Sequence, residues 1–420
     1  MQPPPGTRSP LTSLLEDRLR QRRQRRQLRA RRIVRVLDST HLEVAGQRCV
    51  NFAANNYLGL THHPRLIELA RSMDDGVGTG AAGLVSGYTD AHASAEANVA
   101  QWKSAQAAIL LPSGYQANLA AVQTFAALAG ADGRTVRFLI DKLAHASLID
   151  AVRSSGLPFR VFPHNHLAKL DRLLRESDKS QLQVVVTESI FSMDGDAADL
   201  AGIAQLKRWH PFALLIDEAH ACGVYGDGGA GLLAEAGYPD LADVVICTFS
   251  KAAGGSGGAV CASQLFCDGL ANFGRAYIYS TAVPPLVARM AQTALDIMRD
   301  EPWRQHRVRA LALDLRRKLK AAGVDVPAGD SPIVPVILGD EKTTAGMADE
   351  LMSAGIFVTA IRPPTVPPGT SRLRLTLSCD HTDAEIEHLL AHLTPLINRA
   401  AIKPGDARDD QQPYQSPVPQ

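Results

Sequence analysis

The sequence predicts an α/β fold in which a mostly parallel sheet is flanked by helices and is followed by a smaller C-terminal α+β domain. Between about residues 60 and 285, short apolar segments alternate with helical ones. Several of these segments are continuously apolar, as parallel strands are when helices cover both faces of their sheet. The candidate strands are residues 107–111, 136–140, 159–162, 184–187, 213–216 and 244–248.

The remainder of the chain predicts the second domain. After Pro284-Pro285, a long amphipathic helical stretch runs to about residue 322 and leads to candidate strands at 333–338, 356–361 and 372–377. A last helix is expected to open at Thr382, because Glu385 three residues later completes a capping box. We expect four parts: an N-terminal basic helix and hairpin (1–50), a large domain (51–285), a small domain (286–400) and a disordered tail (401–420).

Composition and charge exclude several classes of protein. The chain has 420 residues, of which 45% are hydrophobic, so it can bury a core of ordinary size. A net charge of +1 argues against a strongly basic nucleic-acid-binding protein. The total hides a segregation, because residues 1–37 carry eleven Arg against two acidic residues and the rest of the chain carries a net −8.

The basic N-terminal segment has a helical pattern of its own. Leucines recur between residues 11 and 28 on an Arg-rich background, and turn signals at 38–39 and 45–46 then predict a small hairpin. A solvated helical face is the default interpretation of most of these arginines. Binding of nucleic acid through this segment is kept as a remote alternative, although we expect no nucleic-acid partner.

Targeting signals are not evident. No apolar stretch reaches the roughly 18–20 residues that a membrane span needs, and the N-terminus lacks the apolar core of a secretory signal. The six cysteines form no CxxC pair and no metal-binding spacing, so we expect reduced and mostly buried thiols. These observations favour a cytoplasmic protein without a membrane partner.

Some motifs point to functions that their surroundings contradict. Residues 78–83 match GxGxxG, but a helical segment precedes them where a dinucleotide-binding loop needs a strand. Residues 217–220 spell the DEAH of helicases, yet the chain has no Gly-Lys dipeptide and hence no GxxxxGK loop. Two histidine pairs have spacings that can hold a metal, but without a third ligand we expect solvated faces and no metal; they are His164 with His166, and His388 with His392.

A lysine follows the last of the six candidate strands. Strand 244–248 ends in Thr248, and Lys251 precedes the small, glycine-rich run 252–258. The carboxyl ends of parallel strands form the crevice in which such sheets bind ligands. Isolated lysines are usually solvated, but a lysine placed beside hydroxyls and glycines suits a Schiff base next to a phosphate. Residues 113–118 (SGYQAN) open a helix whose free N–H groups could bind that phosphate.

The neighbouring strand ends carry acids and histidines. Asp217 follows strand 213–216 and His220 lies about one turn later, so Asp217 could keep a pyridinium nitrogen protonated while His220 contacts the ring. A helix N-cap is the alternative for Asp217. Two further strand ends supply Asp141 with His145 and Glu188 with Ser192. Because all four strand ends meet at one crevice, together they predict a catalytic site.

At these residues the sequence resembles the α-oxoamine synthases, fold-type-I pyridoxal-phosphate enzymes that condense an amino acid with an acyl-CoA. The resemblance covers roughly residues 15–400. It is carried, in family order, by residues 51–60 (NFAANNYLGL), 78–92 (GTGAAGLVSGYTDAH), 113–118 (SGYQAN), 141–151 (DKLAHASLIDA), 186–196 (VTESIFSMDGD), 217–226 (DEAHACGVYG), 248–251 (TFSK), 279–285 (YSTAVPP) and 361–377 (IRPPTVPPGTSRLRLTL). It implies a fold-type-I transferase with a seven-stranded sheet, acting as a homodimer with the active site at the subunit interface.

The resemblance also implies residue roles. Lys251 would hold pyridoxal 5'-phosphate as a Schiff base, Asp217 would pair with its pyridine nitrogen, and His145 would stack on its ring. The other cofactor contacts would come from Gly114, Tyr115, Ser192, His220 and Thr248, with Ser280 and Thr281 from a neighbouring subunit. The substrates would be contacted by Arg29, Asn55, His145, Thr365 and Arg374.

Residues 361–377 carry the sharpest part of the resemblance, because relatives that use glycine or serine usually differ there. They imply an acyltransferase that joins L-alanine to pimeloyl-CoA, or to a pimeloyl-carrier protein, with loss of CO2. Another α-oxoamine synthase, such as 2-amino-3-ketobutyrate CoA ligase with glycine and acetyl-CoA, is the alternative within the family. The amino acid accepted would discriminate between them.

Overall fold

The largest sheet has seven strands, of which five consecutive neighbours run parallel. The computed structural model describes residues 9–24, 27–74, 76–130, 135–176, 178 and 180–401. The strand order is β4-β10-β9-β8-β7-β5-β6, and β10 is antiparallel to both β4 and β9. The strands are β4 (Ala107–Leu111), β5 (Thr135–Asp141), β6 (Phe159–Phe162), β7 (Gln181–Glu188), β8 (Ala213–Asp217), β9 (Val244–Thr248) and β10 (Gly258–Ala262). The predicted α/β fold with a mostly parallel seven-stranded sheet is confirmed.

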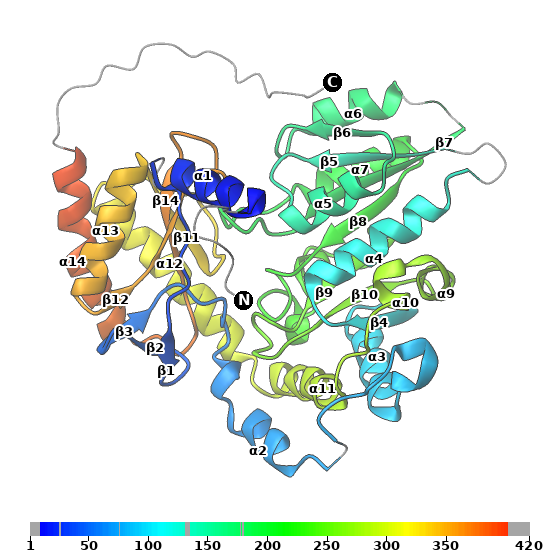
Figure 1. Ribbon diagram of the computed structural model, residues 1–420, viewed down its shortest axis with the longest axis horizontal. Helices are drawn as coiled ribbons and strands as arrows, with labels where there is room; N and C mark the ends of the chain where they lie inside the picture. The colour runs from blue at the N-terminus through cyan, green and yellow to red at the C-terminus, as the bar shows by residue number, and fades with distance from the viewer. Residues whose placement is uncertain are drawn as a thin grey trace.

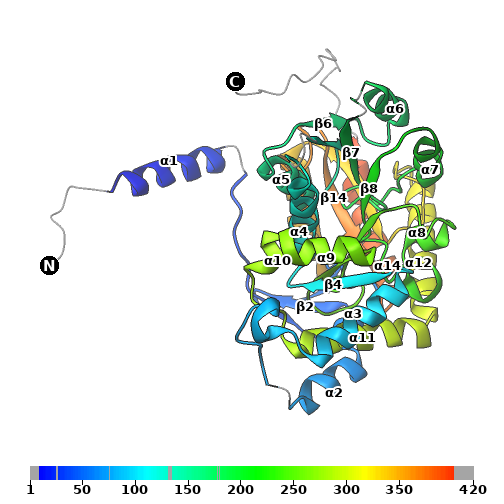
Figure 2. The same ribbon diagram turned by 90° about the vertical axis from the view of Figure 1, so that its right-hand side faces the viewer.

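Strand β7 shows why these segments are continuously apolar. Val184 and Val186 pack into one hydrophobic core, whereas Val185 packs into a second core on the other face of the sheet. Successive side chains of a strand point to opposite faces, so both sets are apolar when helices cover both faces. Figures 1 and 2 show these helices around the sheet: α2 (Pro64–Ser72), α3 (Asp90–Trp102), α4 (Gly114–Ala127), α5 (Ala146–Ser154), α6 (Leu167–Arg175), α7 (Leu200–Trp209), α8 (Leu232–Glu235), α9 (Gln264–Phe273), α10 (Arg275–Ile278) and α11 (Pro285–Asp300).

Two smaller sheets lie beside the C-terminal helices (Figure 1). One has the order β1-β2-β3-β12 and the other the order β11-β14-β13, so the N-terminal meander joins a C-terminal strand. The elements are β1 (Val34–Val36), β2 (His41–Val44), β3 (Gln47–Asn51), α12 (Trp303–Ala321), β11 (Ile333–Gly339), α13 (Glu341–Ser353), β12 (Ile356–Phe357), β13 (Thr359–Ile361), β14 (Ser371–Thr376) and α14 (Asp383–Ala401). The capping box at the start of α14 is confirmed, because Thr382 and Glu385 exchange backbone-to-side-chain hydrogen bonds of 2.7 and 3.2 Å.

Several boundaries differ from the prediction. The helical stretch after Pro285 breaks at Glu301-Pro302 into α11 and α12, since proline suits a helix start but removes a backbone hydrogen bond in the interior. The candidate strand 356–361 divides between two sheets, because β12 pairs with β3 and β13 pairs with β14. Strand β10 was not predicted, because the glycine-rich run before it hides its short apolar segment.

The basic helix α1 (Pro10–Gln24) stands away from the body of the molecule (Figure 2). None of its residues is buried, and its leucines 11, 14, 15 and 19 are exposed. Leu28, the last leucine of the predicted helical pattern, is not helical, and the predicted tail after residue 401 lies outside the described residues. All six cysteines are buried and free, as expected. No described helix is long and apolar enough to cross a membrane.

Candidate active site

The carboxyl ends of β5, β7, β8 and β9 meet at one edge of the central sheet. Asp217 stands opposite Glu188 of β7 and Ile246 of β9 in the strand register. Asp141 ends β5, two strands from Asp217. Asp141, Glu188 and Asp217 therefore lie at the same edge of the sheet, as the sequence predicted.

Lys251 lies on a tight loop between β9 and β10. The Phe249 N–H donates to the Gly257 carbonyl at 3.0 Å, and the Gly254 N–H donates to the Lys251 carbonyl at 3.0 Å. Gly254 has a φ of +67°, and a Cβ there would lie 2.5 Å from backbone atoms of residues 60 and 61. The small residues after Lys251 thus allow this loop to pack against the segment that precedes α2.

The site lowers the pKa of Lys251. Burial of the ammonium group is the main cause and brings the pKa down to about 8, and the positive charge of Arg374 acts in the same direction. The carboxylate of Asp217 opposes the shift. Near pH 7, roughly a tenth of such an amine is neutral, compared with far less than a hundredth of a free lysine.

A hydrogen-bond chain connects Asp217 with His145. The Asp217 carboxylate accepts from the Ala219 N–H at 2.9 Å and from Asn118 Nδ2 at 2.7 Å. Asn118 Nδ2 also donates to Ser147 Oγ at 2.9 Å, which lies 2.7 Å from His145 Nδ1. His145 caps α5 by accepting from the Ser147 N–H, so its Nδ1 carries no hydrogen. Burial lowers the pKa of His145, with Lys251 acting in the same direction and Asp217 opposing it.

His220 sits on a second chain of contacts. Its Nδ1 lies 2.6 Å from Tyr57 Oη, which is 3.2 Å from Asn55 Oδ1. Arg374 Nη1 donates to the same Asn55 oxygen at 3.1 Å, so the predicted pair Asn55 and Arg374 is brought together. Burial is the main cause that holds the pKa of His220 well below its usual value, and the positive charges of Lys251 and Arg374 add to it.

Strand β14 holds the loop that carries Ser192. Arg374 Nε donates to the Ser192 carbonyl at 2.6 Å, and Arg372 forms an ion pair with Asp194. Ser192 itself is buried. Alternate residues of a strand share one face, so the two arginines, two residues apart, can both hold this loop.

The same loop is held from the other side by His164, for which the expectation of a solvated face was wrong. Its Nδ1 lies 3.0 Å from Asp141 and its Nε2 lies 2.7 Å from Asp196. Burial disfavours the charged imidazole, but the two carboxylates outweigh it and raise the pKa of His164 to about 10. His166 caps α6 by accepting from the Lys169 N–H.

The start of α4 faces β9. Ser113 caps the helix, and a Cβ on Gly114 would lie 3.4 Å from Thr248, whose Oγ1 lies 2.9 Å from both Ser250 Oγ and the Gly257 carbonyl. Tyr115 is half-exposed and donates to Asp150 at 2.8 Å. The free backbone N–H groups of the first turn of α4 thus lie beside the hydroxyls of Thr248 and Ser250, and Gly114 has no side chain to fill the space between them. This arrangement suits a phosphate.

Four more expected residues lie at the periphery. Arg29 Nη2 donates to Thr365 Oγ1 at 3.1 Å, so this pair, 336 positions apart, is brought together. Thr281, which is exposed, forms an isolated β-bridge with Ala82 in the glycine-rich segment, and half-buried Ser280 precedes it. Neither Ser280 nor Thr281 has a hydrogen bond to the strand-end residues among the described contacts.

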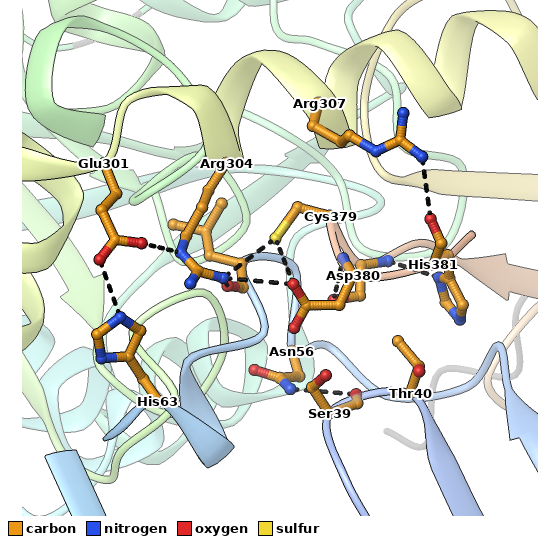
Figure 3. Close-up of polar contacts among 12 residues, drawn as sticks. Ser39, Thr40, Asn56, His63, Glu301, Arg304, Arg307, Cys379, Asp380 and His381 are labelled. Carbon is orange, nitrogen blue, oxygen red and sulfur yellow. Dashed lines mark hydrogen bonds and ion pairs between the residues drawn. The ribbon is translucent and has the colours of Figure 1, made fainter. Parts of the chain in front are cut away.

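A polar cluster ties the segment around Asn56 and His63 to Asp380, which follows β14 (Figure 3). Glu301 accepts from His63 at 3.0 Å and from Arg304 at 2.7 Å. Arg304 also donates to the Leu58 carbonyl at 3.0 Å and to Asp380 at 3.3 Å. The start of α12 therefore fixes both chain segments that meet at Arg374.

The remaining motifs have structural roles. Glu218 of the DEAH segment is fully buried and forms an ion pair with Lys103. Nε2 of His388 lies 3.0 Å from the Ala354 carbonyl, and Nδ1 of His392 lies 2.9 Å from the His388 carbonyl. Within the described part of the chain, no group of three or more metal-ligating side chains could hold a metal.

Four site residues were not predicted from the sequence. Tyr57, Asn118 and Ser147 were not named at all, and Glu188 was noted at a strand end without a role. Tyr57, Asn118 and Ser147 lie inside the segments that carried the family resemblance, but only tertiary contacts bring them to the strand ends. A polar residue on a helix face that packs against a sheet edge is the one signal that could have indicated Asn118, which is 1% exposed.

Comparisons with known proteins agree with this geometry. The model of the class I and II aminotransferase family matches residues 47–393. The 8-amino-7-oxononanoate synthase of Cellvibrio japonicus is 36% identical over 94% of this chain and 98% of its own length. That of Trichlorobacter lovleyi is 40% identical over 84% of this chain and 89% of its own length.

Solved structures show the same architecture. Serine palmitoyltransferase with a pyridoxal-phosphate internal aldimine matches with a TM-score of 0.86 at 28% identity, over 94% of this chain and all of that one. The 8-amino-7-oxononanoate synthase of Francisella tularensis matches with a TM-score of 0.72 at 25% identity, over 84% of this chain and 99% of that one. The family model and the higher sequence identities of the first two relatives together show that the chain belongs to the class I and II aminotransferase family and, within it, to the 8-amino-7-oxononanoate synthases.

Proposed function

We propose that the protein condenses L-alanine with a pimeloyl thioester, of CoA or of a carrier protein, to give 8-amino-7-oxononanoate, CO2 and the free thiol, a step of biotin synthesis. The observation that carries the proposal is the amine of Lys251, with its lowered pKa, at the strand ends that bear Asp217, His145 and His220. Relatives at 36–40% identity with this name support the choice of reaction.

The residues present fit pyridoxal phosphate. Asp217 is a buried carboxylate whose two oxygens each accept one hydrogen bond and can accept another from a pyridinium N–H. Gly114 with Thr248 leaves room for a phosphate at the start of α4. Among the residues that the structure describes, Asn118 Oδ1 and Glu188 Oε1 are buried without hydrogen-bond partners, as expected beside a polar ligand. His145 would stack on the ring; the remaining contacts would come from Tyr115, Ser192 and His220.

The proton chemistry falls to Lys251. When bound, the cofactor provides an electron sink for the carbanion that forms when an amino acid joined to it loses its α-proton. A lysine with a pKa near 8 is partly neutral at physiological pH, so its Nζ can accept that proton and return it to the product. Asp217 keeps a negative charge where the pyridine nitrogen would lie, and this favours the protonated ring.

The substrate carboxylate would be held by Arg374 and Asn55. Arg374 is buried and already donates to Asn55, so a carboxylate at this point would meet a fixed guanidinium. The Tyr57 hydroxyl donates to the Asn55 oxygen and lies 2.6 Å from His220 Nδ1. His220, which stays neutral because its pKa is lowered, would contact an oxygen substituent on the ring through Nε2.

The acyl thioester would enter beside Arg29 and Thr365, which the 3.1 Å hydrogen bond holds together at the surface. A homodimer is part of the proposal, with Ser280 and Thr281 reaching the phosphate of the partner subunit. Its support is the exposed apolar side chains near this segment, Leu84 at 54%, Val85 at 80% and Tyr279 at 73%. Light scattering should give twice the chain mass.

The first test is spectroscopic and uses Lys251. The purified protein should be yellow and lose its Schiff-base absorbance band in Lys251→Ala, while Lys320→Ala, a change at an exposed helix end, should keep the band.

The second test measures CO2 and thiol release with alanine, glycine and serine against a panel of acyl thioesters. Preference for alanine with the pimeloyl chain supports the proposal. Preference for glycine with acetyl-CoA would replace it by the ligase reaction, and no turnover after added cofactor would refute it.

A further inference from the structure

Glu188 is a second carboxyl beside Asp217 for which the proposed chemistry has no use. The two residues end neighbouring parallel strands and stand directly opposite each other in the register of β7 and β8. Residues opposed in this way project from the same face of the sheet, on strands about 4.8 Å apart. Both side chains are buried, with 2% exposure for Glu188 and 5% for Asp217. Two carboxyl groups therefore share one small, buried space at the sheet edge.

Their hydrogen bonds distinguish the two groups. Each oxygen of Asp217 accepts one hydrogen bond, one from the Ala219 N–H and the other from Asn118 Nδ2. Glu188 Oε1 has no hydrogen-bond partner among the described residues. Adjacent buried carboxyls do not both ionise, and the proton stays on the one with fewer donors. That group is Glu188.

The charged groups around Glu188 agree with this assignment. Burial is the main cause that raises the pKa of Glu188 well above its usual value, and the charges of Asp217 on β8 and Asp141 on β5 act in the same direction. Lys251, on the loop after β9, and the backbone N–H of His145 act in the opposite direction without reversing the shift.

We propose that Glu188 is a positioning residue carried as the neutral acid, which leaves Asp217 as the sole anion for the cofactor ring and supports the backbone at His145. The inference rests on the proposed function, because it assigns Asp217 to the pyridine nitrogen. A proton on Asp217 in place of Glu188 would move the negative charge one strand away from the ring nitrogen and weaken the preference for a proton on that nitrogen.

Infrared difference spectroscopy of the cofactor-loaded protein tests the protonation directly. The wild-type spectrum minus that of Glu188→Gln at pH 7 should contain the C=O stretch of a protonated carboxyl, and the band should shift when the sample is exchanged into D2O. In Asp217→Asn, which removes the neighbouring charge, the Glu188 band should disappear at a lower pH than in the wild type. A wild-type spectrum without a protonated-carboxyl band attributable to Glu188 would overturn the proposal.

Cofactor affinity separates positioning from packing. Glu188→Gln keeps the size and a polar head that can donate, whereas Glu188→Met keeps similar volume without polarity. Loss of a buried polar contact predicts a cofactor Kd that rises about tenfold in the methionine variant and about threefold or less in the glutamine variant. Equal loss in both variants would overturn the positioning role. If the methionine variant does not fold, the infrared difference between the wild type and Glu188→Gln still tests whether Glu188 is protonated.

The two proposals fail separately, because the infrared band needs no substrate. A protein that shows the Glu188 band but forms no product from any tested substrate pair would refute the proposed function alone. A protein that forms 8-amino-7-oxononanoate without the band would refute the role of Glu188 alone.

Discussion

Asn118 is the residue through which Asp217 and His145 are connected. It donates to the Asp217 carboxylate at 2.7 Å and to Ser147 Oγ at 2.9 Å, and Ser147 contacts His145. These residues come from three elements, α4, α5 and the end of β8. A single amide thus sets the orientation of both residues that are expected to face the cofactor ring.

We predict that Asn118→Ala weakens cofactor binding. A hydrogen bond to a charged group contributes about 1.5–3 kcal/mol, so the cofactor Kd should rise by roughly ten- to a hundredfold. Ser147→Ala, which leaves the Asn118 to Asp217 bond in place, serves as the matched control and should change the Kd less. The measurement is a titration of the apoprotein with pyridoxal phosphate, followed by absorbance. Equal Kd values for Asn118→Ala and the wild type would show that the amide does not support Asp217.

The strand-end residues could be predicted from sequence because their position follows from the fold class alone. Once β8 and β9 are parallel, Asp217 and the lysine after Thr248 must reach the same sheet edge. Tyr57 and Asn118 could not be placed in this way, since the face that each presents depends on how distant segments pack. His164 was misjudged for the same reason: its two carboxylate partners lie 23 and 32 positions away.

At the scale of elements, the loop after β7 is held from two sides. Strand β14 contacts it through Arg372 and Arg374, and the turn before α6 contacts it through His164. Because this loop carries Ser192, the position of a site residue depends on elements far apart in sequence. Each of the two supports predicts a measurable effect.

His164 should make stability fall with rising pH. Its pKa is raised to about 10 in the folded protein against about 6.5 when unfolded, so its stabilisation is fully present below pH 6.5 and is lost as the pH rises through 10. The free energy of unfolding of the wild type, measured by urea denaturation from pH 6.5 to 9, should fall relative to that of His164→Gln. Parallel pH profiles for the two proteins would mean that His164 is not held charged.

The ion pair between Arg372 and Asp194 should couple β14 to the loop. The Arg372 side chain is 6% exposed, and removal of one member of a buried pair typically costs about 3–5 kcal/mol. Asp194 is 23% exposed, so water can partly solvate its charge and the cost is smaller. We therefore expect Arg372→Met to lower the free energy of unfolding by about 2–3 kcal/mol. Asp194→Asn and the double variant complete a mutant cycle. Additive effects in that cycle would show that the two side chains do not interact energetically.

At the scale of the whole molecule, the net charge of +1 is a cancellation between a basic arm and an acidic body. Helix α1 contributes none of its residues to the core, and after it the chain returns to the surface, where Arg29 contacts Thr365. The small net charge therefore does not exclude an anionic ligand at this edge. The phosphates of a CoA thioester are the anions that the proposed function provides.

Deletion of residues 1–24 tests whether the arm serves that ligand. Since α1 buries no residue, the midpoint of thermal unfolding should stay within about 2 °C of the full chain. The KM for a CoA thioester should rise a few-fold at low salt, and the difference should vanish near 0.5 M salt, where charges about 4 Å or more apart are screened. A variant with arginines 18, 20, 22 and 23 replaced by Gln keeps the helix and should behave like the deletion, because the effect belongs to the charges. An unchanged KM at low salt in both proteins would show that residues 1–24 do not serve the thioester.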